Sequence, residues 1–352
     1  MKKKIIGGAA VALAALGLYK VLESDGGDSG GEQNGAGAAG EVWSAADVPD
    51  LSGKVIVVTG ANSGVGFEAA KVFAQNGAKT ILACRNRGRA ENALRDIESE
   101  VPGAAAEVMI LDLASLDSVH HFADAFKARY EQLDVLVNNA GIMMVPYGRT
   151  EEGFELQFGT NHLGHFALTG LLLGRILQTP GARVVTVSSS AHRWARADFD
   201  NLMYEGGKGY SPRGAYGRSK LANLLFTHEL QRRFEAVGAD AMALAAHPGF
   251  AATNLSSHLT DHWYARPFRP LLQLMAQSAA MGALPAIRAA VDPQAGGGQY
   301  FGPGGFMEQR GYPVVVQTSR AAHDREAARW LWQRSEELTG VRYEELDRVP
   351  AA

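Results

Sequence analysis

Thr59-Gly60-Ala61-Asn62-Ser63-Gly64-Val65-Gly66 is the stretch that decides the fold. An apolar, β-branched run at 54–59 precedes it, and a helical pattern at 65–76 follows it directly. Glycines let the backbone turn tightly and approach a pyrophosphate, which then binds free N–H groups at the positive end of the helix dipole. The G-x-x-x-G-x-G spacing therefore predicts a dinucleotide-binding loop, and the alternative is a glycine-rich turn that only helps strand and helix to pack. The residues expected to contact the dinucleotide are Gly60, Asn62, Ser63, Gly64, Val65 and Gly66.

Strand-like and helix-like patterns alternate along the chain beyond this loop. Further strands are expected at 80–84, 107–113, 134–138, 183–188 and 241–246, with a short last one near 299–301, and helices at 118–130, 154–177 and 213–237. Most of the strand runs are almost continuously hydrophobic, as expected of strands that helices cover on both faces. The alternation predicts an α/β fold, a doubly wound parallel sheet of the Rossmann type in a single domain with right-handed crossovers.

Composition excludes several classes of protein. With 352 residues, 46% hydrophobic and 20% charged, the chain can bury a large core, and the bulk of it is not disordered. A net charge of -3 and the lack of a basic, aromatic-interleaved face give no reason to expect a nucleic-acid partner. Cys84 is the single cysteine, which excludes an intramolecular disulfide and a CxxC metal or redox motif, and no metal site is expected.

The N-terminal segment, residues 1–24, differs from the rest of the chain. Three lysines at 2–4 precede an uncharged run at 5–19, and Lys20 separates this run from two more apolar residues. A helix over 5–22 would be about 27 Å long, close to the ~30 Å hydrocarbon core of a bilayer. We expect membrane association through residues 5–22, with a cleaved signal on an exported protein or a soluble tail on a cytoplasmic one as alternatives. Residues 25–48 predict a Gly-rich linker, 49–315 the α/β domain and 316–352 a helical extension.

The end of the second predicted strand indicates which dinucleotide binds. An acidic residue there would accept hydrogen bonds from the ribose hydroxyls of NAD(H), but the chain reads Ala83-Cys84-Arg85-Asn86-Arg87. Arg85 could pair with the 2′-phosphate of NADP(H) through its guanidinium fork, so NADP(H) is favoured over NAD(H). The alternative is that Arg85 and Arg87 are solvated loop charges. Asp112 and Leu113, which end the third strand, could hold the adenine edge, although a strand-terminal Asp also often caps a helix.

Tyr216 and Lys220 are the candidate acid/base pair. They lie four residues apart in Tyr216-Gly217-Arg218-Ser219-Lys220 and so share one face of a predicted helix. A phenol with a pKa near ~10 is a poor base at neutral pH unless a neighbouring ammonium stabilises the phenolate. With that help, Tyr216 could protonate a carbonyl oxygen or deprotonate an alcohol. The same spacing is also common on ordinary helix surfaces.

Polar and small residues near other strand ends support this interpretation. The serines at 188–190 follow the strand at 183–188, where a hydroxyl could hold the substrate oxygen or simply cap a helix. Asn161 falls within the helical stretch 154–177, where Asn is mildly unfavourable and therefore suggests a specific role. Asn138-Asn139-Ala140-Gly141 and His247-Pro248-Gly249 end two strands with small residues that a cofactor could approach closely.

Taken together, these motifs resemble the short-chain dehydrogenase/reductase family over roughly residues 51–312. The resemblance implies that Tyr216 is the acid/base, and that Lys220 lowers its pKa and binds the nicotinamide ribose. It also implies that Ser189 anchors the substrate oxygen and that Asn161 links a water-mediated proton relay to Lys220. The cofactor contacts that the family implies are Asn139, Ala140, Gly141, Tyr216, Lys220, Pro248, Gly249 and Thr253.

Within this family the chain is most similar to retinol-dehydrogenase-like and WW-domain-oxidoreductase-like members. The motifs that carry this similarity are Asn161-His162-Leu163-Gly164-His165-Phe166, Ser219-Lys220-Leu221-Ala222-Asn223, His247-Pro248-Gly249 and the basic Arg85. The branch implies an NADP(H)-dependent oxidoreductase that interconverts an alcohol and a carbonyl on a retinoid-, steroid- or prenyl-aldehyde-like molecule. Light-dependent protochlorophyllide reductases share the first motif, and they and a non-catalytic scaffold of the same fold are the alternatives.

A lipophilic substrate would need an apolar lid, which the family implies directly after Gly249. The lid candidates are Phe250, Leu255, Trp263, Tyr264, Phe268, Leu271, Leu272, Leu274 and Met275, with Met143, Met144 and Trp194 approaching from the other side. Such a wall suits a lipophilic ligand. The alternative is that many of these residues belong to the core or to an interface between copies, and a homo-oligomer remains open.

Overall fold

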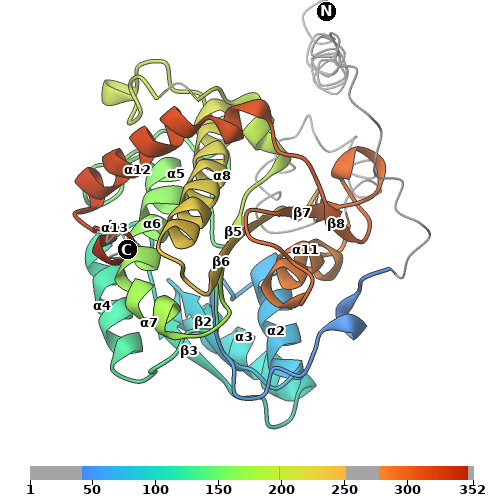
Figure 1. Ribbon diagram of the computed structural model, residues 1–352. Coiled ribbons are helices and arrows are strands. Elements are labelled where there is room, and N and C mark those ends of the chain that lie inside the picture. Colours follow the sequence, from blue (N-terminus) through green and yellow to red (C-terminus); the bar gives the residue numbers. More distant parts are fainter. Residues whose placement is uncertain (1–41, 198, 251–276, 348–352) are drawn as a thin grey trace, which may run out of the picture.

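The computed structural model describes residues 42–197, 199–250 and 277–347 (Figure 1). The strands are β1 (Val55–Thr59), β2 (Lys79–Cys84), β3 (Ala106–Ile110), β4 (Val135–Asn138), β5 (Ala182–Val187), β6 (Ala241–Ala246), β7 (Tyr300–Pro303) and β8 (Pro313–Val315). The α-helices are α2 (Gly64–Gln75), α3 (Arg87–Glu100), α4 (Leu116–Lys127), α5 (Leu156–Phe158), α6 (Gly164–Leu171), α7 (Leu173–Gln178), α8 (Pro212–Ala236), α11 (Ala279–Val291), α12 (Arg325–Thr339) and α13 (Glu344–Asp347). Short 3-10 turns are η1 (Ala45–Asp47), η3 (Ser190–Trp194), η4 (Glu205–Gly207), η6 (Phe306–Glu308) and η7 (Arg320–His323), and η2 (Gly159–Leu163) is a π-helical turn.

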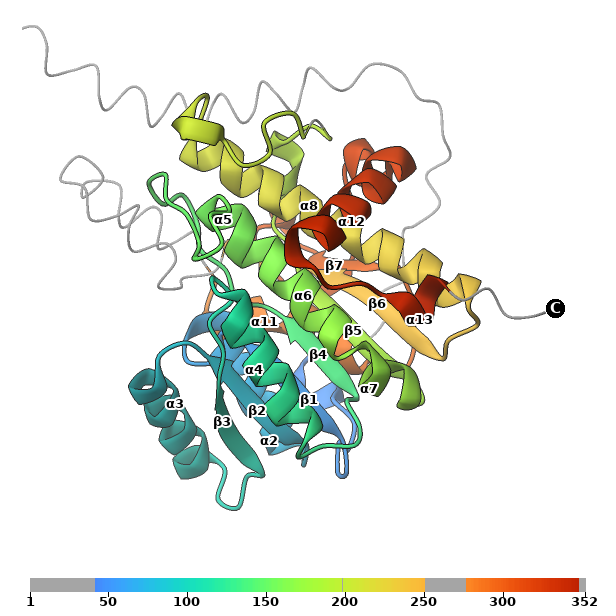
Figure 2. The same ribbon diagram turned by 90° about the vertical axis from the view of Figure 1, so that its left-hand side faces the viewer.

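All eight strands form one sheet in the order β3-β2-β1-β4-β5-β6-β7-β8. The pairs from β3 to β7 are parallel, and β8 joins β7 antiparallel at the edge. The chain moves outward from β1 to β3 and then returns to β4 on the other side of β1 (Figure 2). Ligands of such sheets bind beyond the carboxyl ends of the strands, at the point where the order reverses.

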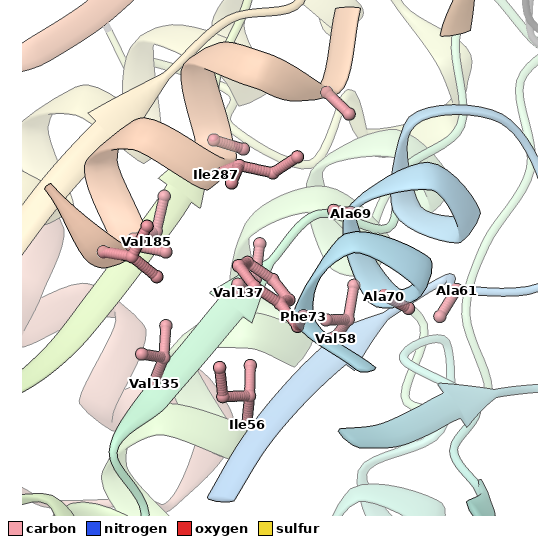
Figure 3. Packing of buried hydrophobic residues seen from close by; sticks show 14 of the residues in the cluster. Ile56, Val58, Ala61, Ala69, Ala70, Phe73, Val135, Val137, Val185 and Ile287 are labelled. Carbon is pink, nitrogen blue, oxygen red and sulfur yellow. The ribbon is translucent and has the colours of Figure 1, made fainter. Parts of the chain in front are cut away.

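Side chains alternate between two hydrophobic layers along the central strands, because successive strand residues point to opposite faces. Ile56 and Val58 pack with Phe73 of α2 and Ile287 of α11 in one buried cluster (Figure 3). Val57 joins the other cluster, to which α4, α6 and α8 contribute. Figure 2 shows α4 and α6 in front of the strands, with α2 behind them. The near-continuous apolar runs of the sequence therefore reflect burial on both faces.

The C-terminal helices close the second layer. Trp332 of α12 is buried, and Arg233 of α8 stacks with its guanidinium carbon 4.2 Å from the ring centroid. Tyr343, just before α13, donates a hydrogen bond to Phe166 O at 2.7 Å. The described part of the expected extension, residues 316–347, thus packs on α6 and α8, while its division from the α/β domain stays a prediction.

The doubly wound α/β fold is confirmed, with three differences in detail. The helix expected over 154–177 is wrong as one continuous element, because a π-helical turn lies at Gly159–Leu163 and the backbone departs from helical geometry at Leu172. The third strand ends at Ile110 rather than at residue 113. The antiparallel strand β8 was not expected, since it is three residues long and two of them are exposed.

Two predicted segments lie outside the described residues. These are the membrane-association segment 5–22 and most of the expected lid, at 251–276. Within the described ranges, no helix is both long enough and apolar enough to cross a bilayer.

Candidate active site

The glycine loop connects β1 to α2 at the carboxyl edge of the sheet. Gly60 and Gly64 have φ of 68° and 58°, a region that favours glycine. A Cβ at Gly66 would lie 2.4 Å from Asn139 Nδ2, so the third glycine allows α2 to approach β4 closely. Ser63 precedes the helix without making a side-chain capping hydrogen bond. First-turn N–H groups of α2 therefore keep donors that an anion could take.

Cys84, at the end of β2, contacts the same glycine loop. The thiol accepts backbone hydrogen bonds from Ala61 and Asn62. Burial raises its pKa to about 12, so the group stays a neutral thiol. No role is predicted for this cysteine from the sequence, and the structure shows it supporting the loop.

Thr59 and His165 link the glycine loop to Asn161, a connection that the sequence did not reveal. Thr59 Oγ1 accepts hydrogen bonds from Asn139 N and Ala140 N, both at 2.9 Å, and lies 2.9 Å from His165 Nε2. His165 Nδ1 lies 3.0 Å from Asn161 O. Because a carbonyl only accepts, Nδ1 carries the hydrogen, and Nε2 then accepts from the Thr59 hydroxyl. Burial lowers the pKa of His165 to about 4, which keeps the ring neutral.

Asn161 is fully buried in the π-helical turn, a rare element that often marks functional sites. Its side chain pairs with the backbone of Ile142, accepting from N at 2.8 Å and donating to O at 3.0 Å, and it also donates to Ser219 Oγ at 2.9 Å. A Cβ at Gly141 would lie 3.1 Å from Asn161 Oδ1 and 3.6 Å from Lys220 Nζ. Asn161 and Lys220 therefore converge on the turn that follows β4.

Lys220 makes hydrogen bonds through both its side chain and its backbone carbonyl. Its ammonium donates to Val187 O at 2.9 Å, and its own carbonyl accepts from Ser188 Oγ at 2.8 Å. Burial lowers the pKa of Lys220 to about 8, since an ammonium loses hydration there without a carboxylate to replace it.

Tyr216 lies on the same helix, α8, and is 7% exposed. The Lys220 ammonium is 5.8 Å from its ring centroid. Burial raises the pKa of Tyr216 to about 12, and a hydrogen bond with Ser189 acts in the opposite direction. In the protein alone, burial thus dominates, and a lowering of this pKa by Lys220 remains a prediction.

Ser188 and Ser189, which follow β5, make different contacts. Ser188 is buried and fastens α8 through the Lys220 carbonyl. Ser189 is half-buried, contacts Tyr216, and accepts from Ala191 N at 3.2 Å as the cap of η3. Ser189 therefore caps η3, and its expected role in holding the substrate oxygen stays a prediction.

The residues expected at the adenosine end are close together. Arg85 Nε lies 3.8 Å from Asp112 Oδ2, and the Arg85 side chain is 70% exposed. Asp112 also accepts from Ala114 N at 3.0 Å, so it shapes the turn before α4, whose cap is Ser115. Leu113 is buried, and a Cβ at Gly164 would lie 2.4 Å from its carbonyl oxygen.

Near the nicotinamide end, Pro248 and Gly249 follow β6. Gly249 has φ of 61°, and a Cβ there would lie 2.4 Å from Gln309 O. Thr253 lies outside the described residues. The sequence-predicted residues that are described thus follow the carboxyl ends of β1 to β6, apart from Asn161 in η2 and Tyr216 and Lys220 on α8.

Comparison with known proteins agrees with this arrangement. The family model for short chain dehydrogenases matches residues 54–263, and the chain belongs to this family of oxidoreductases. Within the family it falls in the retinol dehydrogenase-like branch. It is 39% identical to human retinol dehydrogenase 13 over 296 residues, covering 83% of this chain and 86% of that protein. It is 38% identical to mouse retinol dehydrogenase 14 over 348 residues, covering 95% and 98%.

Solved structures show the same fold. A crystal structure of an uncharacterised protein from Mycobacterium paratuberculosis is 42% identical, with a TM-score of 0.72 over 86% of this chain and 99% of that one. A short chain dehydrogenase from Shigella flexneri, complexed with NADP, is 24% identical with a TM-score of 0.55, over 71% and 97% of the two chains.

Proposed function

We propose that this protein is an NADP(H)-dependent oxidoreductase that interconverts an alcohol and a carbonyl on a lipophilic, retinoid-like small molecule. The observation that carries the proposal is a buried phenol, Tyr216, in hydrogen-bond contact with Ser189 and one helical turn from the buried ammonium of Lys220. Membership of the short chain dehydrogenase family supports the class of reaction. The similarity to retinol dehydrogenases supports the class of substrate.

The residues around the carboxyl edge fit a nicotinamide dinucleotide. Gly60 and Gly64 allow the backbone to approach a pyrophosphate, and the first turn of α2 offers N–H donors. Lys220 uses one of its three donors on Val187 O, which leaves two for the hydroxyls of a ribose. The remaining residues proposed to contact the cofactor are Asn62, Ser63, Val65, Gly66, Arg85, Asp112, Leu113, Asn139, Ala140, Gly141, Tyr216, Pro248, Gly249 and Thr253.

Proton transfer falls to Tyr216 in this proposal. When bound, the nicotinamide would exchange a hydride with the substrate carbon. In the reducing direction Tyr216 donates its phenolic proton to the carbonyl oxygen, while the Ser189 hydroxyl donates a hydrogen bond to the same oxygen. The Lys220 ammonium stabilises the phenolate that remains, and Asn161 helps a water return a proton to it. In the oxidising direction the phenolate removes the proton of the alcohol.

The proposed preference for NADP(H) rests on Arg85. Its contact with Asp112 is long, and at 70% exposure such a pair contributes little, so the guanidinium is free to turn toward a 2′-phosphate. Apolar side chains after β4 and β5, at Met143, Met144 and Trp194, support a lipophilic substrate. Trp194 is 37% exposed, and Arg213 lies 4.2 Å from its ring centroid.

A fluorescence titration with NADPH and NADH tests the proposal in wild type, Arg85→Ala and Arg87→Ala. Arg87 is a matched control, since it is 69% exposed and its pair with Glu91 is as long, at 3.8 Å. We expect Arg85→Ala to weaken NADPH binding about tenfold or more without changing NADH binding, and Arg87→Ala to change neither. Turnover of all-trans-retinal with NADPH would support the substrate class. Equal or tighter binding of NADH by the wild type would overturn the assignment of NADP(H).

A further inference from the structure

Two side chains from distant parts of the chain, Arg193 and His247, meet Glu308 in the loop between β7 and β8. Arg193 binds both carboxylate oxygens, with Nη1 3.2 Å from Oε2 and Nη2 3.1 Å from Oε1. His247 Nε2 lies 3.3 Å from Oε2, a close contact without hydrogen-bond geometry, and among the described residues this nitrogen has no hydrogen-bond partner. His247 is 1% exposed, while Arg193 and Glu308 are 31% and 25% exposed. These three residues, called the Glu308 joint below, thus combine a buried ring with a half-buried ion pair.

The two partners of Glu308 come from the two segments that carry candidate site residues. Arg193 belongs to η3, which begins directly after Ser189. His247 follows β6 and precedes Pro248 and Gly249. Glu308 thus joins the segment of the proposed substrate-oxygen anchor to the segment proposed to line the nicotinamide.

Further contacts tie the same two segments in place. His192 Nδ1 lies 2.7 Å from Ser189 O, and the same ring accepts from Ser319 N through Nε2 at 3.1 Å. The loop that contains Glu308 also contacts the segment after β6 through its backbone, because Phe250 N donates a hydrogen bond to Gln309 O at 2.8 Å.

The backbone of Glu308 is strained. Met307 and Glu308 have φ of 51° and 56°, in the left-handed region that side chains other than those of Gly, Asn and Asp seldom adopt. Such conformations persist only where surrounding contacts hold them, and they cluster at functional sites. The contacts around this one are those with Arg193 and His247, together with the hydrogen bond from Glu308 N to Gly305 O at 3.0 Å.

The joint requires a carboxylate. Gly249 N donates to His247 Nδ1 at 3.3 Å, so the hydrogen of the neutral ring is on Nε2, the atom that lies 3.3 Å from Glu308 Oε2. Three donor atoms therefore converge on two oxygens. Burial opposes ionisation of Glu308, but the contacts with His247 and Arg193 outweigh it and hold its pKa at about 2. A glutamine has the same shape but would turn its NH2 group toward one of these donors.

We propose that Glu308 is a positioning residue for the oxidoreductase reaction proposed above, on which this inference rests. By fixing Arg193 and His247 on one carboxylate, it holds Ser189 at the distance from the Pro248–Gly249 segment that hydride and proton transfer require. A displacement of about 1 Å in such an arrangement can lower the rate about 10²-fold. The affinity for NADPH depends mainly on the glycine loop and Arg85, which lie on other strands.

Glu308→Gln is the test, with Glu337→Gln as a matched control. Glu337 also pairs with an arginine, Arg334, at 2.7 Å, but it is 63% exposed and far from the site in sequence. In the full chain we expect Glu308→Gln to lower kcat about tenfold or more while the Kd for NADPH changes less than about threefold. Arg193→Lys keeps the positive charge but cannot bind both carboxylate oxygens at once, so it should lower kcat by a smaller factor than Glu308→Gln. This variant provides the test if Glu308→Gln does not fold.

Hydrogen exchange separates this inference from the proposed function. Glu308→Gln should speed amide exchange in both 189–195 and 247–250, whether or not a substrate turns over, and Glu337→Gln should leave both segments unchanged. If the wild type is active, faster exchange in Glu308→Gln together with an unchanged kcat in that variant would overturn the positioning role. Unchanged exchange in both segments would overturn the joint itself, whereas an inactive wild type would overturn only the proposed function.

Discussion

Replacing Lys220 with methionine should make the protein more stable at neutral pH, although it removes a proposed catalytic residue. The side chain is 3% exposed, and its ammonium has a pKa of about 8, against 10.5 for an ordinary lysine. At 1.36 kcal/mol for each tenfold change in proton affinity, the charged side chain destabilises the fold by about 3 kcal/mol at pH 7. Methionine has a similar length and no charge to bury.

The substitution also removes a hydrogen bond, which sets the net effect. The Val187 carbonyl loses the ammonium but still accepts from Asn223 Nδ2 at 3.1 Å. A lost hydrogen bond of this kind costs about 1 kcal/mol. We therefore expect Lys220→Met to raise the free energy of unfolding by about 2 kcal/mol at pH 7.

Urea unfolding between pH 7 and pH 10.5 measures this effect and its sign. The unfolded lysine still binds its proton between pH 8 and 10.5 where the folded one has lost it, so wild-type stability should rise with pH across that window. The advantage of Lys220→Met should shrink over the same range. Lys208→Met, at an exposed position, is the control and should show no such trend. A variant less stable than the wild type at pH 7, or an advantage independent of pH, would refute the reasoning.

Two further predictions follow from the site. Turnover in the reducing direction should fall as the pH rises through about 8, because Lys220 then loses the charge that stabilises the phenolate, and a pH profile of kcat that stays flat to about pH 9.5 would contradict this. Thr59→Val should lower the free energy of unfolding by about 2–4 kcal/mol, since it leaves Ala140 N without an acceptor and the buried His165 Nε2 without a donor. Thr80→Val removes only a 3.4 Å contact and should cost less than about 1 kcal/mol, so equal losses in urea unfolding would count against the Thr59 network.

Much of the site could be predicted because its motifs are local. The glycine loop lies between a strand and a helix that each carry their own pattern, and Tyr216 and Lys220 are one helical turn apart. Arg85 stands out because the end of β2 has no acid. These features need only the neighbouring residues to be recognised.

What the sequence could not reveal depends on contacts between distant residues. His165 meets Thr59 across 106 residues, and Arg193 meets Glu308 across 115. Nothing in the local pattern of either pair indicates a partner. The different tasks of Ser188 and Ser189 depend on how α8 packs against the end of β5, and the π-helical turn at Asn161 depends on tertiary packing that helix propensity does not capture.

Turnover by Tyr216→Phe tests the central claim most directly. Tyr204→Phe is a matched control, since Tyr204 is also 7% exposed and has no proposed part in the chemistry. The account predicts that Tyr216→Phe lowers kcat with NADPH and all-trans-retinal by about 10²–10⁴-fold while NADPH still binds, and that Tyr204→Phe turns over like the wild type. Near-normal turnover by Tyr216→Phe would contradict the assignment of the acid/base, and NADPH binding without turnover in the wild type would favour a non-catalytic scaffold.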